Sequence, residues 1–128
     1  MIDHLSFGVT DIARSRLFYD GALGALGYRM LSGDDRALGY GADEPVLWLY
    51  KTSRAVQSGP ESGLHVAFKA ADRDAVAAFH RQALQLGGHD NGVPGLRSSY
   101  GPSYYAAFAI DPDGYRLEAH CELAKATP

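Results

Sequence analysis

Cysteine is almost absent from this sequence, and so is any excess of positive charge. The single cysteine, Cys121, cannot close a disulfide within the chain, and its place in an apolar alternation favours a packed core residue. The 12 Lys and Arg residues are scattered among 15 Asp and Glu residues, which leaves a net charge of −3. Without a basic stripe to meet phosphates, we expect neither nucleic acid nor a membrane surface as a partner.

The first residues lack the features of a secretion signal. Met1 to His4 run directly into a strand-like pattern, with no basic segment and no apolar core. We therefore expect a cytoplasmic protein. The length fits one domain spanning residues 1–128, and the 15 glycines indicate many tight turns.

An internal repeat organises the chain. Residues 4–27 align without gaps with residues 65–88, an offset of 61 (65 − 4), and seven of the 24 positions are identical. The identical pairs are His4 and His65, Phe7 and Phe68, Asp11 and Asp72, Phe18 and Phe79, Ala22 and Ala83, Leu23 and Leu84, and Gly27 and Gly88. The repeat predicts two halves, about residues 1–51 and 63–123, joined by residues 52–62.

Both halves show the same order of elements. Each opens with a strand-like alternation and continues with a helical stripe, which an aspartate begins and a glycine ends (Asp11 and Asp72, Gly27 and Gly88). Three short strands are expected after the first helix. In the second half, two clear strands surround the turn of residues 111–114, and the segment 88–101 is expected to hold a strand and a long loop.

Strand alternation puts three ligand-type residues on the face away from the helices. In the first strand of each half the apolar residues face the helix, which leaves His4 and His65 on the other face. In the last strand the third of these residues, Glu118, likewise lies opposite the apolar positions, on the same face as His120. If the halves are related by pseudo-twofold symmetry, both histidines reach one cleft. Imidazole and carboxylate groups bind divalent metals, so the sequence predicts a metal site there.

The remaining histidines are interpreted differently. His80 lies within the second helical stripe and His89 follows it, and we expect both at the surface.

Three segments resemble the vicinal oxygen chelate superfamily, which includes glyoxalase I, extradiol dioxygenases, fosfomycin-resistance enzymes and bleomycin-binding proteins. They are residues 2–7 (IDHLSF), 63–68 (GLHVAF) and 111–118 (DPDGYRLE). The resemblance spans nearly the whole chain and implies an α+β fold, with two βαβββ modules forming a curled mixed sheet around a metal cleft. It also implies that His4, His65 and Glu118 are ligands of one divalent ion, which could be Fe, Zn, Ni or Mn.

One position departs from the superfamily pattern. A fourth ligand is common 70 residues before the glutamate, and that position (118 − 70 = 48) is Trp48. Glyoxalase I commonly has Glu there, so glyoxalase activity is in doubt and three ligands remain, as in non-haem Fe(II) oxygenases. Extradiol dioxygenases usually add a histidine that acts as acid and base, and a tyrosine ten residues before the glutamate, but that position (118 − 10 = 108) is Phe108. Tyr50, Tyr104, Tyr105 and His120 are left as candidates for these roles.

Two functions stay open at this point. The first is a metal-dependent enzyme, dioxygenase-like or lyase/isomerase-like, that acts on a small substrate with vicinal oxygens. Its candidate catalytic residues are Tyr105 and His120, and its candidate pocket residues are Trp48, Tyr50 and Phe108. The alternative is a non-catalytic protein of the bleomycin-resistance type that binds an antibiotic or toxin.

The expected assembly is a homodimer. Relatives of this length commonly exchange halves between two chains, which would join His4 of one subunit to His65 and Glu118 of the other. The segment joining the halves is long enough for either arrangement, so a site within one chain stays open as well.

Overall fold

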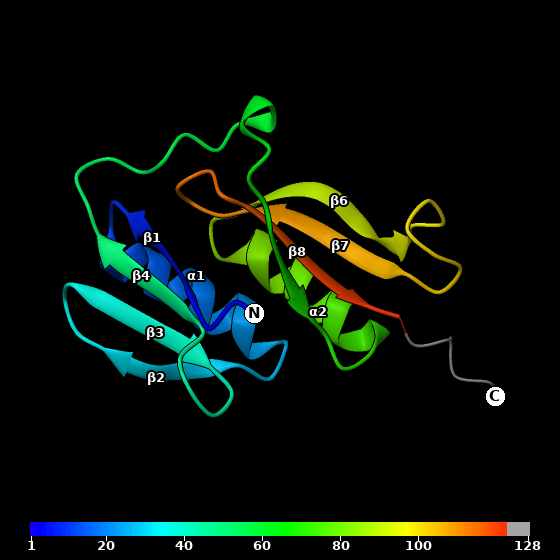
Figure 1. Ribbon diagram of the computed structural model, residues 1–128, viewed down its shortest axis with the longest axis horizontal. Helices are drawn as coiled ribbons and strands as arrows, with labels where there is room; N and C mark the ends of the chain where they lie inside the picture. The colour runs from blue at the N-terminus through cyan, green and yellow to red at the C-terminus, as the bar shows by residue number, and fades with distance from the viewer. Residues whose placement is uncertain (123–128) are drawn as a thin grey trace.

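Each half of the chain forms a four-stranded sheet covered by one helix (Figure 1). The structure is a computed structural model and describes residues 1–122. The first half contains β1 (Leu5–Val9), α1 (Ile12–Gly24), β2 (Arg29–Gly33), β3 (Ala37–Gly41) and β4 (Leu47–Lys51). A 3₁₀ turn, η1 (Pro60–Ser62), precedes the second half, which contains β5 (Val66–Lys69), α2 (Arg73–Gln85), β6 (His89–Leu96), β7 (Tyr105–Ile110) and β8 (Arg116–Cys121). The predicted α+β class with two βαβββ modules is confirmed.

The two sheets have the same strand order. The first runs β1-β4-β3-β2 and the second β5-β8-β7-β6, with β1 parallel to β4 and β5 parallel to β8. In Figure 1 the sheets lie side by side, both helices lie behind them, and the segment joining the halves crosses above. The first strand of each half is an edge strand, and in the described part of the chain the two sheets share no hydrogen-bonded strand pair.

The repeat sets the helix boundaries. The first residues of α1 and α2 are 61 positions apart (73 − 12), and so are their last residues (85 − 24). The side chains of Asp11 and Asp72 accept hydrogen bonds from the third backbone N–H group of their helices, at 3.0 and 2.8 Å. Both aspartates therefore cap helices as predicted, by supplying an acceptor that the first turn lacks.

The helix ends differ from the expectation at one position. Gly27 adopts a left-handed conformation (φ 86°) after α1, but after α2 it is Gly87 (φ 102°), not Gly88. Gly88 is required for a different reason, since a Cβ there would lie 2.7 Å from the Phe18 ring. The identity of Gly27 and Gly88 in the repeat thus has two separate physical causes.

A shared core joins the halves. The helices α1 and α2 pack against each other, and the equivalent residues Phe18 and Phe79 are both fully buried. Cys121 is 5% exposed, which confirms its expected place among packed apolar residues. No helix in the described residues is long and apolar enough to cross a membrane.

The turn between β7 and β8 fastens the second half to the first. The carboxylate of Asp113 accepts hydrogen bonds from the Thr10 backbone N–H (3.1 Å), the Thr10 hydroxyl (2.6 Å) and the Arg14 guanidinium (3.0 Å). Next to it, the Tyr115 hydroxyl donates to the backbone carbonyl of Gly8 at 2.6 Å. These bonds fix the start of β8 against the end of β1, and so set where the side chains of β8 stand.

Candidate functional site

The parallel pairing of β5 with β8 brings two of the predicted ligands together. Ala67 is the register partner of Glu118, and His65 stands two residues before it, at the entry to β5. The Nε2 atom of His65 lies 2.9 Å from Oε1 of Glu118. The Glu118 side chain is only 4% exposed, whereas that of His65 is 53% exposed. A buried carboxylate therefore meets an accessible imidazole.

Tyr104 holds the other oxygen of this carboxylate. Its hydroxyl donates to Oε2 of Glu118 at 2.5 Å. Burial raises the pKa of the Tyr104 phenol, and the hydrogen bond to Glu118 and the charge of that residue raise it further. The phenol therefore stays protonated and acts as a fixed donor that orients Glu118.

The ring of His120 packs against the ring of Tyr104. It is two residues beyond Glu118 on β8, and its ring stacks on Tyr104 with centroids 4.6 Å apart and planes 5° apart. Its Nδ1 atom is enclosed and has no hydrogen-bond partner among the described residues. The stack limits the rotation of both rings.

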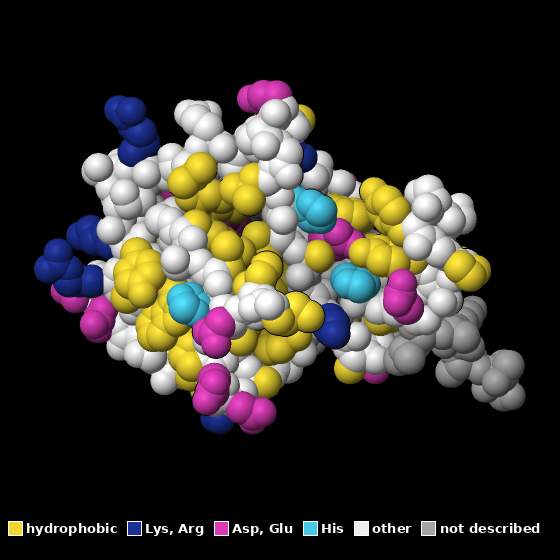
Figure 2. Space-filling view, in the orientation of Figure 1, with side chains coloured by type: hydrophobic (Ala, Val, Ile, Leu, Met, Phe, Trp, Pro, Cys, Tyr) yellow, Lys and Arg dark blue, Asp and Glu magenta, His cyan; other side chains and the backbone are white. Residues whose placement is uncertain are grey.

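A cavity of about 920 Å³ opens over this group of side chains. Its walls come from the segment before β5, the loop between β6 and β7, and the exposed faces of β7 and β8. They include Leu64, His65, Tyr100, Tyr104, Phe108, Arg116 and Glu118. Figure 2 shows histidine and acidic side chains gathered beside hydrophobic ones over the second sheet. The cavity is therefore mostly apolar with a few converging polar groups, as small-molecule sites commonly are.

The predicted site residues divide between two regions. The structure brings together His65, Glu118 and Phe108 in the cavity, with His120 next to it. His4 lies apart from them before β1, where its Nδ1 is 2.7 Å from the Asp3 carboxylate. Its side chain is 52% exposed.

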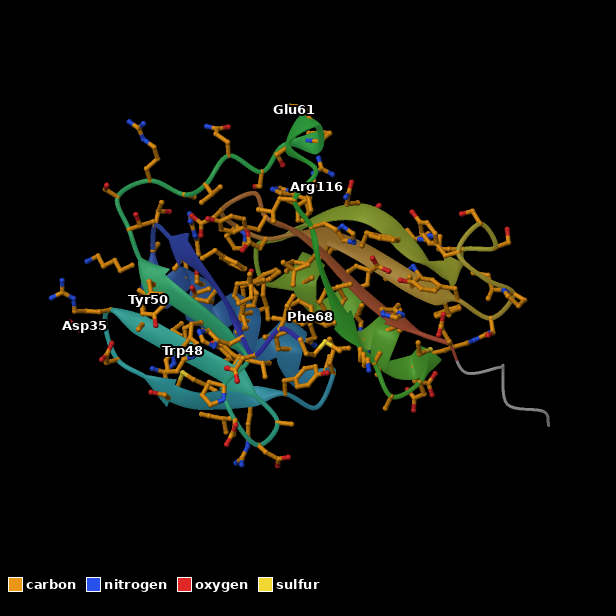
Figure 3. The ribbon with its side chains drawn as sticks, in the orientation of Figure 1. Asp35, Trp48, Tyr50, Glu61, Phe68 and Arg116 are labelled. Atoms are coloured by element: carbon orange, nitrogen blue, oxygen red, sulfur yellow. The ribbon has the colours of Figure 1, made fainter. Side chains whose placement is uncertain are left out.

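Trp48 and Tyr50 lie on the first sheet, outside this cavity (Figure 3). Their rings stack at 6.1 Å and 22°, on the face away from α1. The Trp48 indole covers Gly39, its register partner on β3, where a Cβ would lie 2.8 Å from the ring. The two aromatic side chains form a flat apolar surface on the first half.

Tyr105 faces the helix side of the second sheet. Its ring packs against the small cluster formed by Val76, Ala107 and Cys121, and the Arg73 guanidinium lies 4.8 Å from its centroid. Tyr104, one residue earlier, is the tyrosine that reaches Glu118. Strand alternation contains the signal for this, because Tyr104 is in phase with Phe108, which pairs with Glu118.

His80 corrects an expectation from the sequence. It is 8% exposed rather than a surface residue, and its Nε2 lies 2.8 Å from the Asp90 carboxylate. The helical pattern alone does not reveal a carboxylate that arrives from β6. His89 is exposed, as expected.

The chemistry of the donor set fits a divalent metal. An imidazole nitrogen and a carboxylate oxygen face each other at the cavity wall, and both groups are common ligands of first-row metals. Tyr104 supplies the outer hydrogen bond that such ligands usually have. Within residues 1–122 of a single chain, no three His, Cys, Asp or Glu side chains are grouped closely enough to hold a metal.

Comparison with known proteins points to one family. Residues 1–119 match the Glyoxalase/Bleomycin resistance protein/Dioxygenase superfamily. A glyoxalase/bleomycin resistance protein from Albidiferax ferrireducens T118 is 27% identical, with a TM-score of 0.80 over 91% of this chain and 95% of that one. None of the curated proteins compared matches the chain.

Two more distant structures share the fold. A glyoxalase-related enzyme from Fulvimarina pelagi is 18% identical, with a TM-score of 0.72 over 94% of this chain and 86% of that one. The fosfomycin resistance protein FosX from Mesorhizobium loti is also 18% identical, with a TM-score of 0.68 over 94% and 90%.

Proposed function

Because the chain belongs to the Glyoxalase/Bleomycin resistance protein/Dioxygenase superfamily, we propose that it is a divalent-metal-dependent enzyme acting on a small substrate with vicinal oxygens. The observation that carries the proposal is the approach of His65 to Glu118 at 2.9 Å in the wall of a large, mostly apolar cavity. This is where a ligand set and a substrate would meet. The proposed chemistry is dioxygenase-like or lyase/isomerase-like.

His65 and Glu118 would hold the ion, with His4 as the third ligand. A bound ion with three protein ligands keeps coordination positions free and polarises substrate oxygens as a Lewis acid. The chain's own residues prepare this site. Tyr104 holds Oε2 of Glu118, which leaves Oε1 directed at His65.

His120 would act through Tyr104. It stacks on the phenol but does not line the cavity, so we propose that it positions Tyr104 rather than contacting substrate. Phe108, which does line the cavity, would contact the apolar part of the substrate. Tyr105 faces the helix side and has no place in this arrangement.

A second copy of the chain would supply His4. Asp3 holds Nδ1 of His4, which leaves Nε2 available on an exposed side chain. A groove of about 440 Å³ runs beside the edge strands β1 and β5, and its apolar lining includes Ile2, Leu5 and Val46, which are 85%, 38% and 47% exposed. An apolar surface next to an available ligand supports a homodimer with shared sites.

A second candidate function rests on Trp48 and Tyr50. Their stacked rings offer a flat apolar surface where the superfamily often has a metal ligand. This favours a small-molecule binding protein of the bleomycin-resistance type, which would bind an antibiotic or toxin without turnover. Binding without any metal-dependent reaction would support this candidate over the enzyme.

The test is metal content measured by elemental analysis on protein purified without chelator. We expect His4→Ala, His65→Ala and Glu118→Ala each to lose most of the bound metal, because each removes one of three ligands. Tyr104→Phe should weaken metal binding about 10-fold or more, since it removes only the outer hydrogen bond. A screen for oxygen uptake with catechols, run on the same samples, tests the dioxygenase chemistry.

The matched control is His89→Ala. His89 is exposed and lies outside the cavity, so its removal should leave the metal content unchanged. Unchanged metal in all three ligand variants would contradict the proposed site.

A further inference from the structure

Within residues 1–122, Arg116 is the one Lys or Arg side chain that lines the cavity, and it has no counter-ion. It shares with Glu118 the face of β8 that lines the cavity, and its side chain is half-buried (Figure 3). Within residues 1–122, its Nε atom is enclosed without a hydrogen-bond partner, and Arg116 takes part in no ion pair. A guanidinium in this position is positively charged and only partly hydrated.

Glu118, the acidic residue nearest to Arg116 along β8, already has hydrogen-bond partners. Both oxygens of Glu118 have partners, His65 on one and Tyr104 on the other. Burying a charge costs free energy unless a partner of opposite charge offsets the lost hydration. The charge of Arg116 is therefore available to a ligand in the cavity.

We propose that Arg116 is an anion subsite that binds an oxyanion group of the substrate, a carboxylate or a phosphonate. The guanidinium is planar and presents paired N–H donors, which match two oxygens of such a group. This inference deepens the proposed function, on which it rests for the position of the reacting oxygens. It names the substrate class as a small acid with an apolar body.

The spacing along β8 defines the shape of that acid. Arg116 and Glu118 are two residues apart on one strand face, which places their Cα atoms about 7 Å from each other. The oxyanion would lie at Arg116, and the vicinal oxygens would lie near His65 and Glu118. Leu64 and Phe108 line the space between and around them and suit an aliphatic or aromatic body.

The first half has no equivalent charge. The position 70 residues before Arg116 (116 − 70) is Val46, which is 47% exposed and apolar. The anion subsite therefore belongs to the second sheet alone.

The experiment compares phenylacetate with phenylacetamide, which have the same ring and nearly the same shape but differ in charge. Dissociation constants are measured by NMR titration on metal-stripped protein. Wild type should prefer phenylacetate by about tenfold, because hydrogen bonds to a charged group are the stronger ones. Arg116→Gln should reduce the ratio of the two dissociation constants to about one. Arg116→Lys should keep part of the preference, since lysine keeps the positive charge but lacks the paired N–H donors of the guanidinium. A third probe, phenylphosphonate, distinguishes which oxyanion binds better.

Arg73→Gln is the matched control. Arg73 is also half-buried with an unpartnered Nε, but it stacks on Tyr105 outside the cavity, so its loss should leave the preference intact. Equal binding of the two probes to wild type, binding of neither, or a preference that survives in Arg116→Gln would overturn the proposal. So would an equal loss in Arg73→Gln. Because no metal is present, these results do not depend on whether the metal site is correct.

Discussion

At equivalent points of the two sheets, β4 carries Trp48 and β8 carries Glu118. The equivalence follows from the register, because Trp48 pairs with Ser6 of β1 and Glu118 pairs with Ala67 of β5, which are 61 residues apart in the repeat (67 − 6). The same backbone plan thus presents an indole in one half and a metal-type ligand in the other.

The neighbouring strands compensate for this difference in size. Trp48 lies opposite Gly39, which leaves room for the indole, whereas Glu118 lies opposite Phe108. The aromatic ring of each pair therefore lies on β4 in the first half and on β7 in the second. A repeat can thus keep the same strand pairing at two positions while their chemistry changes completely.

The turns before these strands differ in the same way. The residue 70 positions before Asp113 (113 − 70) is Asp43, in the turn between β3 and β4. Asp113 is only 2% exposed in its side chain and joins the two halves, whereas Asp43 is exposed. Among residues 1–122, side-chain hydrogen bonds from such a turn to the other half come from the second half alone.

The largest expected effect comes from mixing two variants that each lack one of the proposed metal ligands. If the site is shared, His4→Ala and Glu118→Ala proteins brought together under subunit-exchanging conditions should form heterodimers in which one of the two sites is intact. Elemental analysis of isolated heterodimers should then recover metal in half of the sites, from almost none in either parent. If no metal is recovered, all three ligands lie in one chain, and the site is not shared between subunits.

The next effect concerns the two turns. Asp113→Ala should lower the free energy of unfolding by about 2–4 kcal/mol, because it leaves the Arg14 guanidinium and the Thr10 N–H without their acceptor. Asp43→Ala, the matched control, should change it by less than about 0.5 kcal/mol. Urea unfolding measures both, and equal losses would show that the two turns are not used differently.

The smallest effect is a pH dependence at the partner of His80. A hydrogen bond from the Gly92 N–H, and then the bond and charge of His80, lower the pKa of Asp90. As pH falls, the Asp90 carboxylate therefore becomes protonated at a higher pH in the unfolded chain than in the folded one. The contribution of Asp90 to stability is present above the ordinary Asp pKa of about 3.9 and is lost below it.

Asp90→Asn removes this contribution. We expect its thermal unfolding midpoint to fall less than that of wild type between neutral pH and pH of about 3, with Asp43→Asn behaving like wild type. A wild-type pH dependence in Asp90→Asn would assign the effect to other carboxylates.

In the first half the position equivalent to His80 (80 − 61) is Tyr19, whose hydroxyl donates a hydrogen bond to the Asp111 carboxylate instead.

The sequence by itself determined the elements and their faces. The 61-residue repeat predicts both helices, Asp11 and Asp72 begin them, and alternation places Glu118 and His120 on the face away from α2, because these features depend on neighbours within a few residues. Alternation also carried the information that Tyr104, rather than Tyr105, reaches Glu118. The register of β7 against β8 is needed to tell which of the two tyrosines lies on the face of Glu118.

Only the tertiary structure decided which side chains meet. The contact of His65 with Glu118 joins residues 53 positions apart, and it exists because β5 and β8 are parallel neighbours. The burial of His80 depends in the same way on β6, which brings Asp90 to it. Within residues 1–122, Arg116 has no ion-pair partner because the strands and helices around it bring no acidic side chain within reach. Such pairings are set by the packing of whole strands and helices, which no local pattern in the chain encodes.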